Sequence, residues 1–428
     1  MGTRRGEAYS FSTSKRKTPG KGILPFMRIP LASSGLREKD IARLNEVLVS
    51  GNVTMGKQVR EFEMQIARYL GVNHFVMVNS GSSANLAIFE ALMRPTKGDP
   101  LLRVGDEVLV PAIAWPTTIW PIIQLGLKPI FCDVDIDNYG LDIAQARTIL
   151  SKTQNKIRAI FPIHPLGYAL DSNAIHQLSI DFDLVEIYDT CEALGSFRNG
   201  VHAGSDGLAA TFSFYFSHHL TTMEGGGIAT NSSSLADDLR SIRSHGWSRD
   251  RTDSSEWQHG NSGTDRKFTF VSTGFNLRPM EIQGAIGVSQ LADLDSFIDK
   301  RRTIATLVKD ALKGSALSLI EGDAVDTQNA KQHSRMLISI LDNRGKESKE
   351  RIRSNLENKG VETRPPLTGN FLAQPAAKRV IDQSFDSKNY INAQFLTEHS
   401  FLIGCHHDYS DNQIDYLVDV LYECSQLR

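Results

Sequence analysis

The sequence predicts an α/β protein with a mostly parallel sheet covered on both faces. Between residues 75 and 188, short apolar segments alternate with segments of helical periodicity, and turn-forming residues separate them. Apolar strands that alternate with helices are typical of parallel sheets with helices on each side. The chain has 428 residues, 40% of them hydrophobic and 22% charged, so it is long enough for one large domain and a smaller one.

The composition argues against several classes of function. The net charge is −2 and the body of the chain has no dominant basic block, which disfavours nucleic acid as the main partner. No stretch approaches the roughly 18 consecutive apolar residues of a membrane span. The four cysteines lie far apart and lack the spacing of a zinc or redox motif, so we expect no metal site and a reduced, cytoplasmic location.

The first 70 residues predict a tail and two helices. Residues 1–26 are rich in Ser, Thr, Gly, Lys and Arg and lack the apolar centre of a secretion signal, which predicts a flexible basic tail. We expect Ser34 to cap the first helix and residues 51–56 to separate it from the second. Each helix has one apolar face, formed by Ile41, Leu44, Val47 and Leu48 in the first and by Val59, Phe62, Ile66 and Leu70 in the second.

Five apolar segments then predict strands, at residues 75–78, 107–110, 129–132, 157–161 and 184–188. Residues 84–93 and 142–150 have helical patterns. In sheets of this kind, functional groups come from loops beyond the carboxyl ends of the strands. Those loops are therefore where we expect the site.

Three of these loops contain residues suited to a flat, phosphorylated ligand. Gly81 and Ser82 stand at a helix N-terminus, where free N–H groups suit a phosphate, although a plain helix cap fits the same pattern. Trp115 follows a strand and is either a stacking ring or a core residue. Asp189 also follows an apolar strand, where an ionised carboxylate is costly without a positive partner. A protonated pyridine nitrogen would be such a partner, but an Asp that caps the next helix is as common.

A fourth segment, residues 210–230, reads as two strands with a polar loop between them. Ser213 precedes the loop, His218 and His219 lie in it, and Glu224 and three glycines follow. A turn with two solvated imidazoles is the simpler interpretation. The other three loops favour a site, because together the four segments hold the parts needed to bind pyridoxal phosphate.

The chain resembles the vitamin B6-dependent nucleotide-sugar aminotransferase family (DegT/StrS type), which has the aspartate-aminotransferase fold, also called fold type I. The resemblance runs from about Ile29 to the C-terminus and implies a large domain with a seven-stranded type of sheet plus a smaller α+β domain. Its markers are segment 79–85, Asp189 with Glu192, Ser213-Phe214, segment 224–226, and segment 274–278 followed by 281–283.

One departure from the family pattern decides the expected activity. In the family's aminotransferases, a lysine five residues after the serine of Ser-Phe binds the cofactor covalently; here that residue is His218. An imidazole cannot form this bond, and the surrounding pattern looks like that of the family's sugar 3-dehydratases. A dehydratase branch with an iron–sulfur cluster is disfavoured, because residues 245–273 contain no cysteine.

The resemblance implies removal of the C3 hydroxyl from a nucleotide-linked 4-keto-6-deoxyhexose. Glutamate would convert pyridoxal phosphate to pyridoxamine phosphate, and His218 would act as base and then acid, for which an ordinary histidine pKa is suitable. Two alternatives stay open at this stage. The chain could be a nucleotide-sugar 4-aminotransferase that tolerates histidine, or a catalytically silent binding or regulatory protein.

The resemblance also implies roles for individual residues. The expected cofactor contacts are Gly81, Ser82 and Ser213 at the phosphate, Trp115 over the ring, Asp189 at the pyridine nitrogen and Glu192 beside it. Asn276 and Arg278 would reach the phosphate from the second subunit of a homodimer with shared active sites. His219 is expected to support His218 or contact substrate, and His164 and Arg364 are sugar-contact candidates that equally fit surface positions.

The domains are expected at residues 27–290, the large cofactor-binding unit, and 291–428, the small C-terminal unit. A helix should continue past Gly287 through Leu291, Leu294 and Phe297. In the small unit we expect a strand at 335–340 and helices at 348–359 and 411–422. At residues 333–336 the sequence departs from the aromatic pattern expected of the dehydratases. The resemblance therefore does not define the substrate pocket at this segment.

Overall fold

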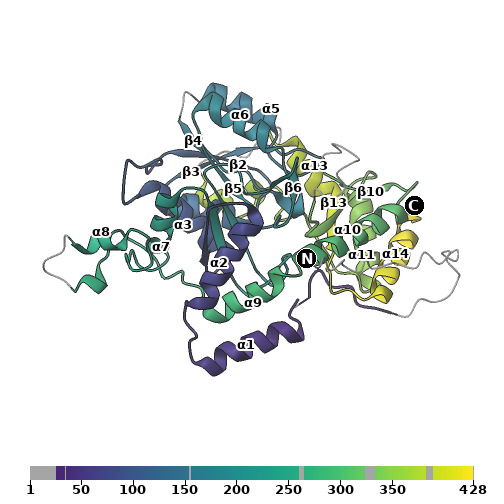
Figure 1. Cartoon of the computed structure of the whole chain (residues 1–428). Coiled ribbons are helices and arrows are strands. Elements are labelled where there is room, and N and C mark those ends of the chain that lie inside the picture. Colours follow the sequence, from purple (N-terminus) through teal and green to yellow (C-terminus); the bar gives the residue numbers. More distant parts are fainter. Residues whose placement is uncertain are drawn as a thin grey trace.

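The structure is a computed structural model that describes residues 26–33, 35–153, 156–259, 265–322, 333–381 and 389–427 (Figure 1). The predicted basic tail, except Phe26, lies outside the described residues. Within the described residues, no helix is long and apolar enough to cross a membrane.

A seven-stranded sheet forms the centre of the larger unit. Its strand order is β1 (His74–Val78), β9 (Gly226–Thr230), β8 (Ala209–Ser213), β5 (Val185–Asp189), β4 (Ile157–Ile160), β2 (Glu107–Pro111) and β3 (Lys128–Cys132). Only β9 runs against the others, because its pairings with β1 and β8 are antiparallel while those from β8 to β3 are parallel. The carboxyl ends of the six remaining strands therefore meet at one edge, as predicted for a mostly parallel sheet.

Helices bury both faces of this sheet. Alternate residues of a strand point to opposite faces, and in β1 Val76 and Val78 join one core while Phe75 and Met77 join another. The helices of this unit are α2 (Lys57–Leu70), α3 (Gly81–Met93), α4 (Pro116–Gln124), α5 (Ile143–Lys152), α6 (Ser172–Phe182), α7 (Ser233–Ile242), α8 (Ser254–His259) and α9 (Glu281–Leu291). Shorter elements are β6 (Phe197–Arg198), β7 (Val201–His202), η1 (Pro165–Gly167) and η2 (Arg266–Phe268).

The smaller unit has a four-stranded antiparallel sheet and its own core, and it lies beside the larger unit in Figure 1. The strand order is β10 (Leu317–Leu319), β11 (Leu337–Asp342), β13 (Ser400–Gly404) and β12 (Thr363–Arg364). Its helices are α10 (Leu294–Ala311), α11 (Lys346–Asn358), η3 (Phe371–Ala373), α12 (Ala377–Val380), α13 (Ile391–His399) and α14 (Asp411–Ser425). Ile29 is buried in this core and pairs with Val361, so the segment that precedes α1 packs with the C-terminal residues.

The first helix differs from the prediction. Helix α1 (Glu38–Ser50) begins after Arg37, whose guanidinium binds the Asp40 carboxylate at 2.9 Å, so the predicted cap at Ser34 lies too far upstream. Ser34 itself lies outside the described residues. Of the predicted apolar face, Val47 is buried, but Ile41 and Leu48 are about half exposed, at 47% and 50%. The predicted helix is therefore present, but within the described residues its apolar face is only partly buried by other segments.

Two boundaries in the smaller unit also differ. The helix expected to run through Phe297 is broken into α9 and α10 at Ala292 and Asp293, where the Asp293 carboxylate binds Arg37 at 2.5 Å. The strand expected from Arg335 begins at Leu337, because Arg335 has a left-handed φ of 56° that an extended strand does not accommodate.

Candidate active site

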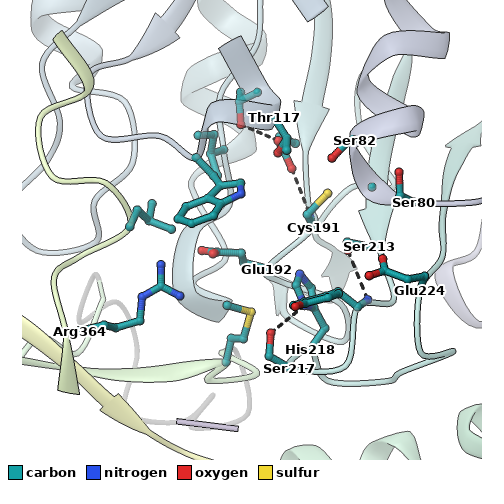
Figure 2. Close-up of a pocket in the computed structure, with 18 residues that line it drawn as sticks. Ser80, Ser82, Thr117, Cys191, Glu192, Ser213, Ser217, His218, Glu224 and Arg364 are labelled. Carbon is teal, nitrogen blue, oxygen red and sulfur yellow. Dashed lines mark hydrogen bonds between the residues drawn. The ribbon is translucent and has the colours of Figure 1, made fainter. Parts of the chain in front are cut away.

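A cavity of about 330 Å³ opens at the edge of the sheet where the parallel strands end (Figure 2). It is lined by the start of α3, the loop after β2, the ends of β5 and β8, and the loop between β8 and β9, and on the other side by residues of the smaller unit. The lining residues are Ser80, Gly81, Ser82, Trp115, Thr117, Thr118, Ile163, Asp189, Cys191, Glu192, Ser213, Tyr215, Ser217, His218, Glu224, Met336, Arg364 and Leu367. The structure thus brings together eight of the predicted site residues: Gly81, Ser82, Trp115, Asp189, Glu192, Ser213, His218 and Arg364.

The start of α3 forms one wall. Ser80 is the N-cap, and its hydroxyl accepts the Ser83 N–H at 3.1 Å. The first N–H groups of a helix have no partner within the helix and carry the positive end of its dipole, so they suit an anion. Gly81 allows β8 to approach closely, because a Cβ at this position would lie 2.7 Å from the Ser213 Cβ. The start of α3 and the end of β8 are therefore too close together for a residue larger than glycine at position 81.

Asp189, at the end of β5, is held by three hydrogen bonds and is only 3% exposed. Its Oδ2 accepts from Asn85 Nδ2 at 3.0 Å and from Thr118 Oγ1 at 2.8 Å, and its Oδ1 accepts from the Cys191 N–H at 3.1 Å. These donors fix the carboxylate at the cavity wall, where one protonated ring nitrogen would meet it. Asp189 therefore lines the cavity, and a turn rather than a helix follows it, so it is not the helix cap that was the alternative; its contact with a cofactor stays a prediction.

Trp115 and Arg364 face each other across the cavity mouth. The Trp115 side chain is 45% exposed, so it is not a core residue, and the Arg364 guanidinium carbon lies 5.3 Å from the centre of its ring. Arg364 comes from β12 in the smaller unit, and Figure 2 shows its guanidinium directed toward Glu192. The pair gives the cavity one flat aromatic wall and one cation.

Glu192 contributes a carboxyl group whose pKa is higher than that of an ordinary glutamate. Its Oε2 accepts the Leu166 N–H at 2.8 Å. Burial raises its pKa to about 7, against opposing effects of that hydrogen bond and of Arg364. At neutral pH the carboxyl group is therefore protonated about as often as not, which allows it to give or take a proton.

His218 lies in the loop after β8 with its ring at the cavity. A hydrogen bond from the His218 N–H to the Tyr215 carbonyl, at 3.0 Å, forms a turn in this loop. The Ser217 Oγ lies 3.4 Å from the His218 Nδ1. Burial, followed by the positive charges of Arg301 and Arg364, lowers the pKa of His218 to about 4. The expected ordinary pKa is thus corrected: the ring is neutral at pH 7, and it binds a proton less tightly than an ordinary histidine does.

The structure places two predicted substrate contacts elsewhere. His219 is fully buried behind the loop and does not line the cavity, which matches a supporting role only. His164 is 2% exposed, its Nδ1 accepts the Leu170 N–H at 3.1 Å, and its ring stacks on Tyr188. His164 therefore does not line this cavity, and its expected contact with the sugar stays a prediction.

Asn276 and Arg278 also lie outside the cavity of their own chain. Arg278 Nε donates to Asn276 Oδ1 at 3.0 Å, and Asn276 pairs with Ser244. Their expected position in the site of a second subunit stays a prediction.

Sequence reasoning missed the residues that support the predicted ones. Thr118 and Asn85 both bind the Asp189 carboxylate, and both lie in segments that were already singled out for other residues. Met336 and Leu367 line the cavity from the smaller unit; Met336 belongs to the segment 333–336 that the resemblance relates to the substrate pocket, whereas Leu367 was not predicted to be a site residue.

Comparison with known proteins agrees with this geometry. Residues 35–422 match the DegT/DnrJ/EryC1/StrS aminotransferase family. A GDP-4-keto-6-deoxy-D-mannose 3-dehydratase of Yersinia pseudotuberculosis is 35% identical over 404 residues, which are 92% of this chain and 98% of that protein. A dTDP-4-dehydro-2,6-dideoxy-D-glucose 3-dehydratase of Saccharopolyspora spinosa is 31% identical over 92% of this chain and 86% of its own length.

Among solved structures, a GDP-4-keto-6-deoxymannose-3-dehydratase with a trapped PLP-glutamate geminal diamine superposes with a TM-score of 0.82. It is 33% identical, and the match covers 92% of this chain and 100% of that one. The chain has the fold of the PLP-dependent transferases of fold type I, and it belongs to the DegT/DnrJ/EryC1/StrS aminotransferase family.

Proposed function

We propose that this protein is a PLP-dependent 3-dehydratase that removes the C3 hydroxyl of a nucleotide-linked 4-keto-6-deoxyhexose, with glutamate as amino donor. The observation that carries the proposal is the imidazole of His218 at the cavity, at the position where the family's aminotransferases have a lysine. No lysine lines the cavity within the described residues. Relatives at 35% and 31% identity are named as 3-dehydratases, and a similar structure contains PLP and glutamate.

The cavity fits pyridoxal phosphate in shape and chemistry. The start of α3 with Ser82 and Ser213 would hold the phosphate, and the close approach at Gly81 leaves the N–H groups accessible to it. Trp115 would cover one face of the ring, and Asp189 would bind the ring nitrogen. When bound, the cofactor supplies an amine that joins the sugar ketone and a ring that withdraws electrons from it.

His218 would move the proton. Its Nδ1 faces Ser217, which leaves Nε2 as the nitrogen available to the cavity. The low pKa keeps the ring in its unprotonated form, so it would accept the proton as base, and once protonated it would readily donate that proton to the departing C3 hydroxyl. A lysine here would instead attach the cofactor to the protein, which favours aminotransfer.

Glu192 and Arg364 would bind the reactants. The guanidinium of Arg364 suits a carboxylate of the amino donor or the hydroxyls of the sugar, and it lies against Trp115 where the ring would stack. Glu192, half protonated near neutral pH, can either accept a hydrogen bond from the substrate or donate one.

The decisive experiment is an assay for 3-deoxy ketosugar with PLP, glutamate and the 4-keto-6-deoxyhexoses linked to GDP, CDP, dTDP or UDP. We expect one nucleotide series to be converted and ammonia to be released. The His218→Asn variant, in which the other lining residues are unchanged, is the matched control; it should bind PLP but form no product. Transfer of the amino group to C4 by the unaltered protein, without loss of the C3 hydroxyl, would refute the proposal.

We further propose a homodimer in which Asn276 and Arg278 complete the site of the partner. Both side chains lie away from the cavity of their own chain, which is what supports this arrangement. Inactive Asn276→Ala and His218→Asn chains, mixed under conditions of subunit exchange, should then regain activity, because one site of each hybrid keeps both residues. Absence of recovery after demonstrated exchange would contradict the shared site.

A further inference from the structure

Arg301 is a fully buried arginine directly behind the His218 loop. It lies in α10, is 0% exposed, and forms no ion pair with a carboxylate in the part of the chain that the structure describes. Burial of such a charge is costly unless its N–H groups are satisfied. The interactions that stabilise the buried guanidinium must therefore be other than an ion pair with a carboxylate.

The guanidinium donates to three backbone carbonyls from three separate segments. Nη1 donates to Met336 at 2.9 Å and to Cys405 at 2.6 Å, both in the smaller unit, and Nη2 donates to His218 at 3.2 Å. The planar fork of an arginine can hold several acceptors in fixed directions, which a lysine ammonium cannot do. Arg301 thus ties the backbone of His218 to the residue before β11 and the residue after β13 in the smaller unit.

The same tie also reaches the part of the cavity lining that the smaller unit contributes. The carbonyl that accepts from Nη1 belongs to Met336, whose residue also lines the cavity. One guanidinium therefore fixes the distance between the loop that carries His218 and the wall formed by Met336. A shift of that loop would move the imidazole relative to whatever occupies the cavity.

Arg301 is also a cation among neutral groups. The buried rings of His219, His406 and His407 all have pKa values lowered by burial, and Arg301 is the largest further cause for each. His406, His407 and Asp408 lie close enough to hold a metal ion, but a divalent cation beside Arg301 would be repelled. The charged or titratable groups around His218 are Arg301, Arg364, His219, Asp189, Glu192 and Glu224.

We propose that Arg301 is a positioning residue for His218: its guanidinium holds the backbone of the catalytic loop at a fixed distance from the cavity wall. The reaction assigned to His218 rests on the proposed function, whereas the tie itself rests on the three hydrogen bonds. Arg301 touches neither substrate nor cofactor in this arrangement. Its effect is on where the imidazole lies and on the charge that the ring experiences.

The test compares Arg301→Met, Arg301→Lys and a matched control, Arg302→Met, in the full-length protein with PLP. Arg302 is the next residue of α10 and also donates to a backbone carbonyl of the smaller unit, that of His333 at 2.9 Å, whereas the His218 carbonyl accepts from Arg301. Two quantities are measured: kcat for C3 dehydration, and the pKa of His218 by NMR of ring-labelled histidines. The His218→Asn variant assigns the signal among the 12 histidines.

We expect Arg301→Met to lower kcat about 10- to 100-fold, because small misplacements of a catalytic group have effects of this size. It should also move the His218 titration to higher pH, since one of the nearby positive charges is removed. Arg301→Lys should retain the low pKa but recover only part of kcat, because the charge remains and the fork is lost. Arg302→Met should change kcat less than about twofold and leave the His218 titration unchanged.

The proposal is overturned if Arg301→Met has unaltered kcat and an unaltered His218 signal, or if Arg302→Met lowers kcat as much. If Arg301→Met does not fold, Arg301→Lys decides, and a kcat equal to that of the unaltered protein overturns the proposal. The titration of His218 needs no substrate. A protein without dehydratase activity would therefore refute the proposed function, while the NMR signal would still test the charge that Arg301 contributes at His218.

Discussion

Replacement of Gly81 by alanine should weaken cofactor binding through a steric clash. The added Cβ would lie 2.7 Å from the Ser213 Cβ and 3.1 Å from both the Cys191 Sγ and the Ser213 Oγ. The Ser213 Oγ and the Cys191 Sγ can rotate about χ1, but the Ser213 Cβ, which is the nearest atom, is fixed to the backbone of β8 and cannot. The helix start must therefore move away from β8, and its N–H groups must move with it.

Overpacking of this kind costs roughly 1–3 kcal/mol. If most of that cost falls on the bound state, the Kd for PLP should rise about 10- to 100-fold, because each 1.4 kcal/mol is about tenfold. Fluorescence titration of the cofactor-free protein with PLP measures this change. Urea unfolding of the same protein without PLP measures the part of the cost that falls on folding.

A double-mutant cycle with Ser213→Gly separates the clash from other effects. Ser213→Gly removes both the Cβ and the Oγ that the new methyl group would meet. The loss of unfolding free energy caused by Gly81→Ala should therefore be smaller in the Ser213→Gly background than in the unaltered protein. An equal loss in both backgrounds, or a Kd for PLP within twofold of the unaltered value, would refute the steric argument.

Three further predictions follow from the cavity residues. Borohydride treatment of the PLP-bound protein followed by peptide mass analysis should find no pyridoxyl-lysine, whereas His218→Lys should acquire one at position 218 and lose C3 dehydration; a stoichiometric lysine adduct in the unaltered protein would contradict this. His218→Asn should abolish dehydration, whereas His219→Asn should retain much more activity. Because His219 is fully buried, His219→Asn should also unfold at a lower urea concentration. An equal loss of activity in the two variants would disprove the assignment of the base. Burial raises the Glu192 pKa from 4.5 to about 7, so its contribution to stability is present below pH 4.5 and is lost as pH rises through about 7; Glu192→Gln should flatten this decline in urea unfolding of the PLP-free protein, and an unchanged pH dependence would count against the raised pKa.

The sequence was sufficient for the features that depend on local patterns. Strand and helix periodicity predicted β1 to β5 with α3 and α5, but not α4 or α6, and the strand ends and the loops after them contained Trp115, Asp189 and His218, all of which line the cavity. Residues of this kind are found because their position follows from the chain direction of a parallel sheet.

What the sequence could not provide depends on packing between distant segments. The pKa of His218 is lowered by burial and by two arginines that lie far along the chain, and neither effect has a local signature. The resemblance suggested His164 as a sugar contact, and nothing in its own segment indicated that its ring is buried against Tyr188. The left-handed Arg335 likewise follows from contacts between Met336 and Leu166 and not from its own propensity.

The two-sided construction of the cavity has a consequence for how the protein acquires activity. Contacts that close the cavity join residues very distant in sequence, such as Thr368 and Ala114, which are 254 positions apart, and Phe371 and Ala112. Closing such long loops carries an entropic cost before the contacts stabilise the structure, so these pairs form late in folding. During synthesis, the phosphate-binding turn is made early, while Arg364 and Leu367 leave the ribosome far later. A nascent chain can therefore contain the whole cofactor cradle and still have an open, inactive site.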